Sequence, residues 1–86
     1  MTSAERIVMM ANQIARNLAV QDSDGAVAGT AEHIKKFWDS RMKAIALAHM
    51  AEGGEGLTPI AHAALERLKA DTEAGRAAQT PQTADP

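Results

Sequence analysis

Apolar residues recur at helical spacing from the start of the chain, and the first such stretch covers residues 2–20. The apolar stripe, with intervals of three or four positions, consists of Ile7, Met10, Ala11, Ile14 and Leu18. Thr2 and Glu5 have the spacing of a capping box, in which each side chain bonds the free backbone N–H of the other residue. The pattern therefore predicts a first helix that begins at Thr2.

Val8 and Met9 lie off this stripe, on another side of the same predicted helix. One interpretation is peripheral packing within the chain. The other is a contact face for a second subunit, because flexible methionine side chains adapt to irregular surfaces.

A polar turn over residues 21–25, QDSDG, precedes the second predicted helix, whose N-cap we expect at Ser23 or Asp24. Its inner stripe consists of Val27, Ala31, Ile34 and Trp38, with Phe37 beside them and with Glu32 and Lys36 pointing away. Gly29 within this helix costs roughly 1 kcal/mol relative to alanine. Close approach of a neighbouring helix would offset that cost.

The residues after the aromatic pair predict where the second helix ends. If the helix continued, Arg41 would fall on the apolar face, where an unpaired charge is costly. A break with Asp39 as the N-cap of a third helix avoids this cost. The third helix then carries Met42, Ile45, Ala46 and His49 on one face, while Leu47 projects to another side.

Three glycines within residues 53–56, GGEG, predict the end of the third helix, and Thr58-Pro59 is a strong start signal for a fourth. Its inner face consists of Ala61, Ala64, Leu65 and Leu68. From Thr72 the periodicity is lost, which favours a disordered tail. The chain is therefore predicted to be all-α, with a small bundle of three to four short helices over residues 1–71 and a tail over residues 72–86.

Composition changes this picture by limiting the core. Hydrophobic residues make up 45% of the chain but aromatic residues only 2%, and alanine, which buries little area, supplies much of the rest. A chain of 86 residues has a marginal core in any case. We therefore expect helices that form readily, pack thinly and leave apolar surface for a partner.

The formal charge of −2 argues against a polyanion as partner. No window approaches a membrane span, no signal peptide is recognisable, and there are no cysteines, so we expect a cytoplasmic protein that does not bind membranes. The basic residues around the aromatic pair, Lys35, Lys36, Arg41 and Lys43, leave a helix-turn-helix DNA reader as an alternative.

The sequence offers little catalytic chemistry. His33, His49 and His62 fall on three different helices without a metal-binding spacing. The glycine run follows no strand and lacks the lysine of a phosphate-binding loop. No nucleophile stands beside a base. We therefore expect neither an enzyme nor a resident metal or cofactor in this chain.

Four pieces of the sequence, in their order, resemble the delta subunit of cytoplasmic, NAD-dependent formate dehydrogenases that contain molybdenum or tungsten. The pieces are residues 8–14, VMMANQI; residues 28–41, with His33-Ile34 and Phe37-Trp38; Leu47-Ala48-His49; and residues 53–59, GGEGLTP. The resemblance covers about Glu5 to Leu68. The family commonly has proline where this chain has Ser40, and proline at a first helical turn fits a break after Trp38.

The resemblance implies a non-catalytic accessory subunit that supports assembly, stability or cofactor maturation. In such a complex the alpha subunit carries bis-molybdopterin guanine dinucleotide (bis-MGD) with molybdenum or tungsten, and iron–sulfur clusters. The beta and gamma subunits carry flavin mononucleotide and further clusters. The most direct partner expected is the alpha subunit.

For the contact with that partner we predict Phe37, Trp38, Arg41, Met42 and Met9, because tryptophan and arginine are enriched among binding hot spots. For Trp38, a purely internal core position is the alternative. A free-standing helical regulator that binds nucleic acid or another protein is the second functional hypothesis. A chaperone that leaves the finished enzyme is the third.

Overall fold

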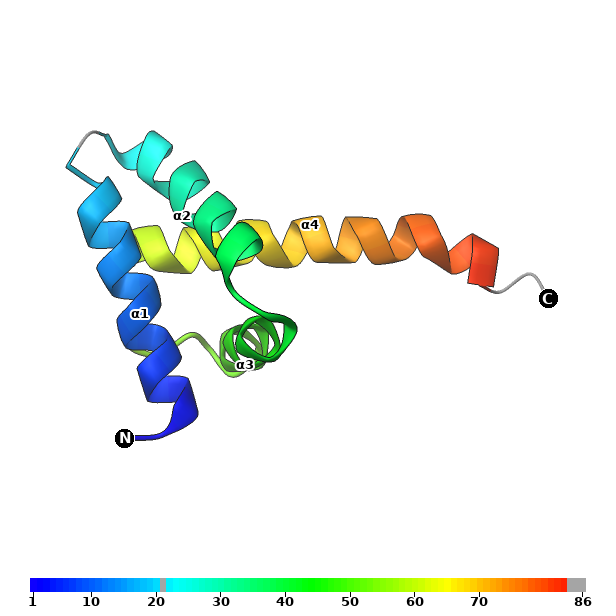
Figure 1. Cartoon of the computed structure of the whole chain (residues 1–86), viewed down its shortest axis with the longest axis horizontal. Helices are drawn as coiled ribbons and strands as arrows, with labels where there is room; N and C mark the ends of the chain where they lie inside the picture. The colour runs from blue at the N-terminus through cyan, green and yellow to red at the C-terminus, as the bar shows by residue number, and fades with distance from the viewer. Residues whose placement is uncertain (21, 84–86) are drawn as a thin grey trace.

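The computed structural model describes residues 1–20 and 22–83, with the side chains of residues 23 and 74–83 excepted. It contains the helices α1 (Ser3–Leu18), α2 (Ser23–Phe37), α3 (Ser40–Ala51) and α4 (Pro59–Thr83). Figure 1 shows α1, α2 and α3 placed around the N-terminal part of α4, which continues beyond them. The prediction of an all-α bundle is confirmed, since the described residues include no strand.

The predicted tail, residues 72–86, coincides largely with residues that the structure does not describe in full. The backbone of α4 passes position 72 without a break and reaches Thr83. Side chains from residue 74 onward, and residues 84–86 entirely, lie outside the description. The prediction of disorder for this segment, and of a domain boundary at residue 71, therefore stays a prediction.

Local hydrogen bonds begin α1, α3 and α4 where the sequence predicted. At α1 the Thr2 N–H donates to Glu5 Oε1 at 2.8 Å, and the Glu5 N–H donates to Thr2 Oγ1 at 3.1 Å. At α3 the Met42 N–H donates to Asp39 Oδ1 at 2.8 Å, so the break after Trp38 is confirmed. At α4 the backbone N–H at position 61 donates to the Thr58 hydroxyl at 3.3 Å.

The expected cap of α2 is wrong by one or two positions. Asp22, rather than Ser23 or Asp24, is the N-cap, and its carboxylate accepts a hydrogen bond from the Gly25 N–H. The run of Asp, Ser and Asp contains several capable caps. Local propensity does not choose among them, because each could cap a helix that begins at the following residue.

The core lies between α4 and the three shorter helices. Its buried apolar residues are Ile7, Ala11, Ala15, Ala26, Ala31, Ile34, Trp38, Ala46, Ala61, Ala64, Leu65 and Leu68. All four residues predicted for the inner face of α4 are in this set. The most extensive contact between helices joins α2 to α4. Alanines at these positions allow the helix backbones to come close together.

Two predicted orientations differ from the structure. Met10, expected on the inner stripe of α1, is 37% exposed at its edge, whereas Ala15 is buried. Leu47, expected to project away from the inner face of α3, packs against the core. In both cases a neighbouring helix decides how wide the buried stripe is, which the spacing of apolar residues alone does not reveal.

Gly29 confirms the expected close approach of a neighbour. A Cβ atom added to Gly29 would lie 3.1 Å from Cδ1 of Leu18 in α1. A Cβ atom at this position would press on the leucine side chain, so the glycine eases the packing of α2 against α1.

The glycine loop between α3 and α4 is fastened to α1 by one side chain. Gly53, Gly54 and Gly56 have positive φ angles, which glycine adopts without strain. Asn12 Nδ2 donates a hydrogen bond to the Gly56 carbonyl oxygen at 2.9 Å. Asn12 Oδ1 accepts a hydrogen bond from the Thr58 N–H at 2.9 Å. Asn12 thus satisfies two backbone groups and sets the start of α4 against α1.

Candidate protein-binding surface

The residues predicted for partner contact divide into exposed and buried positions. Phe37 is 71% exposed and Met9 51% exposed, and Arg41 also faces solvent. Met42 is half-buried against the core. Trp38 is only 5% exposed, so the alternative of a core position describes its place in the isolated chain.

The end of α2 explains why two adjacent rings point in different directions. Phe37 is the last helical residue, and Trp38 is the C-cap in an extended conformation, with φ −84° and ψ 140°. This change of backbone direction turns the indole inward. The Lys43 ammonium group holds the corner by donating a 2.8 Å hydrogen bond to the Lys35 carbonyl near the C-terminus of α2.

A groove of about 440 Å³ lies between the first half of α1 and the start of α3. The residues that line it are Ser3, Arg6, Ile7, Met10, Asp39, Arg41, Met42 and Ile45. Two of the predicted contact residues, Arg41 and Met42, are therefore together. Arg6 and Met10 were missed. Their separation of four residues, which places them on one side of α1, is the signal that could have found them.

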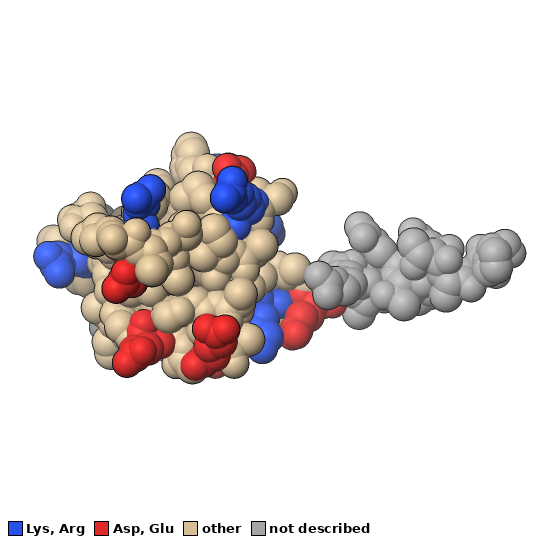
Figure 2. Space-filling model, turned by 90° about the horizontal axis from the view of Figure 1, so that it is seen from below, with Lys and Arg blue, Asp and Glu red and all other residues tan. Residues whose placement is uncertain are grey.

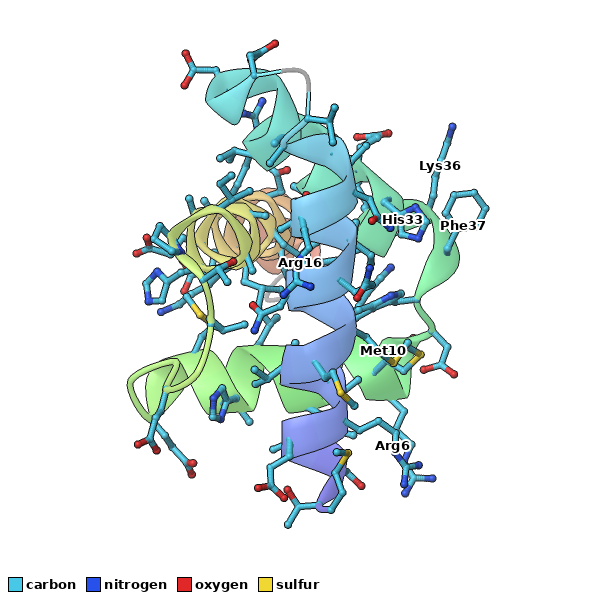
Figure 3. The ribbon with its side chains drawn as sticks, turned by 90° about the vertical axis from the view of Figure 1, so that its left-hand side faces the viewer. Arg6, Met10, Arg16, His33, Lys36 and Phe37 are labelled. Carbon is cyan, nitrogen blue, oxygen red and sulfur yellow. The ribbon has the colours of Figure 1, made fainter. Side chains whose placement is uncertain are left out.

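Phe37 continues this surface beyond the groove. Figure 3 shows Arg6, Met10, His33, Lys36 and Phe37 projecting on the same side of the molecule, whereas Arg16 lies on another side. The rings of His33 and Phe37 are in contact, with their centroids 4.8 Å apart. His33, considered from the sequence as a metal ligand and as part of the family resemblance, thus belongs to an aromatic ridge. We call the following set the Met10 surface: Arg6, Met10, His33, Phe37, Arg41 and Met42.

The Met10 surface combines apolar side chains with basic ones. Among the described side chains, the one ion pair within 4.0 Å joins His62 to Glu66 on α4. Arg6 and Arg41 therefore have no acidic partner within 4.0 Å among the described side chains. Figure 2 shows an uneven distribution of charge, with most acidic side chains of that face along its lower edge and most basic ones along the upper and left edges.

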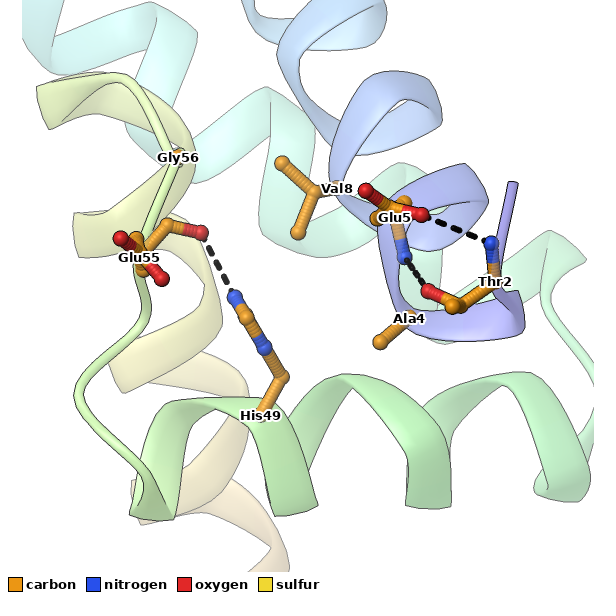
Figure 4. Close-up of a pocket in the computed structure, with 7 residues that line it drawn as sticks. All are labelled: Thr2, Ala4, Glu5, Val8, His49, Glu55 and Gly56. Carbon is orange, nitrogen blue, oxygen red and sulfur yellow. Dashed lines mark hydrogen bonds between the residues drawn. The ribbon is translucent and has the colours of Figure 1, made fainter.

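A second groove, of about 510 Å³, lies between the N-terminus of α1 and the glycine loop, as Figure 4 shows. His49 lines it, and His49 Nε2 is 2.7 Å from the Glu55 carbonyl oxygen. Hydrogen bonds with Thr2 lower the pKa of the Glu5 carboxyl below its ordinary value, and the bond to the Thr2 backbone contributes more than the one to its side chain. These bonds are those of a helix cap, and they bring no reactive pair together.

Two features are absent from the described residues, a cluster of metal ligands and a membrane-spanning helix. These residues contain no group of three or more histidine, aspartate or glutamate side chains arranged to hold a metal ion. Within the same residues, no helix is both long enough and apolar enough to cross a bilayer.

The fold and the Met10 surface define a small helical protein with exposed apolar and basic side chains suited to contact with another protein. The model of the family described as "NADH-dependant formate dehydrogenase delta subunit FdsD" matches residues 6–65. Since this match spans more than half of the 86 residues, the chain belongs to that family, as the four sequence pieces predicted. No curated protein and no solved structure shows significant similarity to it.

Proposed function

We propose that this delta subunit is a non-catalytic accessory subunit that supports assembly, stability or cofactor maturation of the catalytic alpha subunit. The observation that carries the proposal is the family match over residues 6–65, the segment that holds the Met10 surface. An apolar surface with basic side chains suits a docking role. Binding to another protein would remove the exposed parts of its methionine and phenylalanine side chains from water, which is favourable.

In this function, the redox chemistry belongs to other subunits. Bis-MGD with molybdenum or tungsten, the iron–sulfur clusters and flavin mononucleotide would be held in the alpha, beta and gamma subunits. The histidine and acidic side chains described in this chain offer no cluster of metal ligands. We infer that the chain influences formate oxidation through the state of its partners.

The test compares complexes produced with and without the delta chain in the same host. We expect its omission to lower the amount of assembled complex or its molybdenum or tungsten content, and formate-dependent reduction of NAD to fall in proportion. Unchanged assembly, metal content and activity would refute the proposal.

Mass spectrometry of the active, purified enzyme then separates two forms of this function. A stoichiometric delta chain in active enzyme indicates a permanent subunit. Its presence only in metal-free or partly assembled intermediates indicates a chaperone that leaves after cofactor insertion.

A further inference from the structure

We propose that the Met10 surface binds an amphipathic segment of a formate dehydrogenase subunit whose apolar side chain enters the α1–α3 groove and whose aspartate or glutamate residues face Arg6 and Arg41. The inference rests on the proposed function and specifies the chemistry of the partner's contact. The lining and the charge of the groove both favour such a segment, and two other occupants fit the groove less well.

The lining of the groove suits one or a few apolar side chains. Met10 and Met42 contribute from α1 and α3, and the half-buried Ile45 and the buried Ile7 complete the apolar lining. Methionine side chains are unbranched and polarisable, so they can adjust to the shape of an inserted group. The exposed Phe37 provides a second anchor on the same side of the molecule, as Figure 3 shows.

The charge of the groove is opposite to that of the whole chain. The chain carries a formal charge of −2, yet Arg6 and Arg41 line this groove and Asp39 is its one acidic member. Asp39 is already engaged, since its Oδ1 accepts the Met42 N–H at 2.8 Å. Two arginines without an acidic partner among the described side chains therefore favour a segment that carries carboxylates.

Two other occupants fit less well. A second copy, joined face to face through the same surface, would bring its own Arg6 and Arg41 against the first pair, and like charges would oppose the contact. The C-terminal residues of this chain, 74–86, include no apolar side chain larger than alanine apart from proline, and one acidic residue, Asp85. They offer neither a large apolar anchor nor paired carboxylates.

The test uses the full-length tagged delta chain, produced together with the other formate dehydrogenase subunits, and the double variant Arg6→Glu/Arg41→Glu. Both arginines lie near the N-terminal ends of their helices, where the helix dipole accommodates glutamate, so the variant should fold. We expect retention of the partner subunits to fall about tenfold or more, because reversed charges replace attraction by repulsion. Retention by the unaltered chain should also weaken as salt is added.

The matched control is Arg67→Glu/Lys69→Glu, which changes the net charge equally at two exposed positions of α4. This variant should retain the partner subunits nearly as well as the unaltered chain. Equal losses in both double variants would overturn the inference, because the effect would then follow net charge. Circular dichroism of each purified variant checks that the helices are intact.

A third variant, Met10→Lys, tests the apolar half of the contact without touching either arginine. It should also lower retention, since a charge would replace the side chain that meets the inserted group. If the Arg6/Arg41 and Met10 variants retain the partner subunits as well as the unaltered chain does, the Met10 surface is not the contact surface. The proposed function would then still stand. If the unaltered chain retains no formate dehydrogenase subunit, even from metal-free or partly assembled intermediates, the proposed function fails, and the inference fails with it.

Discussion

The contact between α2 and α4 and the groove between α1 and α3 are packed in opposite ways. Along α2 and α4 the buried residues are mostly small, with Ala26, Ala31, Ala61 and Ala64 among them. Along α1 and α3 the side chains at the rim are long and partly exposed, above all Met10 and Met42. Small residues allow two helices of one chain to close on each other, whereas flexible residues at an open groove leave area for another protein.

The difference teaches where a small chain places its limited apolar volume. The bundle has two aromatic residues, and it buries Trp38 while leaving Phe37 exposed. One ring therefore completes the core, and the other extends the candidate binding surface. Experiments that alter each region separately can show whether this division between folding and binding is real.

The largest effect should come from Trp38→Ala, which removes the largest side chain of the core. We expect it to lower the free energy of unfolding by about 3–5 kcal/mol, enough to unfold much of a small domain. Phe37→Ala is the matched control and should change stability by about 0.5 kcal/mol or less. Urea denaturation followed by circular dichroism measures both values, and equal losses would remove the distinction between the two rings.

The packing of small residues around α4 should also resist enlargement. Ala64→Leu adds three carbon atoms at a fully buried position, and overpacking should lower the free energy of unfolding by about 1–3 kcal/mol. Ala44→Leu, at an exposed position of α3, should be nearly neutral. Thermal unfolding of the two variants provides the measurement. A neutral Ala64→Leu variant would mean that α4 is not closely packed at this position.

Thr30 offers a test with the opposite sign. Thr30 is fully buried in α2, and its hydroxyl has no hydrogen-bond partner among the described residues. Thr30→Val keeps the shape and removes the unsatisfied group, so it should raise the free energy of unfolding by about 1 kcal/mol. Thr30→Ser keeps the hydroxyl and loses a methyl group, so it should lower stability. A loss of stability in Thr30→Val would show that the hydroxyl has a partner.

The smallest effect is expected at the N-terminal cap of α1. Its hydrogen bonds with Thr2 lower the pKa of Glu5 below the ordinary value of 4.5, so the folded chain favours the charged carboxylate. The resulting stability is present above pH 4.5 and is lost as the pH falls through the lowered pKa. Glu5→Gln should therefore be slightly less stable than the unaltered chain at neutral pH, with the difference vanishing in acid. Unfolding midpoints measured across this pH range check the sign.

Much of the fold could be predicted because its decisive signals are local. The Thr2–Glu5 capping box and the Asp39 cap each join residues three positions apart, and Thr58-Pro59 marks a helix start within two residues. The candidate surface was predicted in part: Phe37, Arg41 and Met42 belong to it, while Arg6, Met10 and His33 were missed. A groove requires two helices, and the periodicity of one helix does not show where another ends beside it.

By itself, therefore, the sequence determined the helical class, most helix ends and the family, since these depend on the order of neighbouring residues. Tertiary structure decided that Trp38 is buried beside an exposed Phe37 and that Asn12 fastens a loop more than forty positions away. It also decided that Arg6 and Arg41 line one groove. The physical reason is that burial and shared surfaces arise from contacts between helices, whereas a cap is satisfied within a single turn.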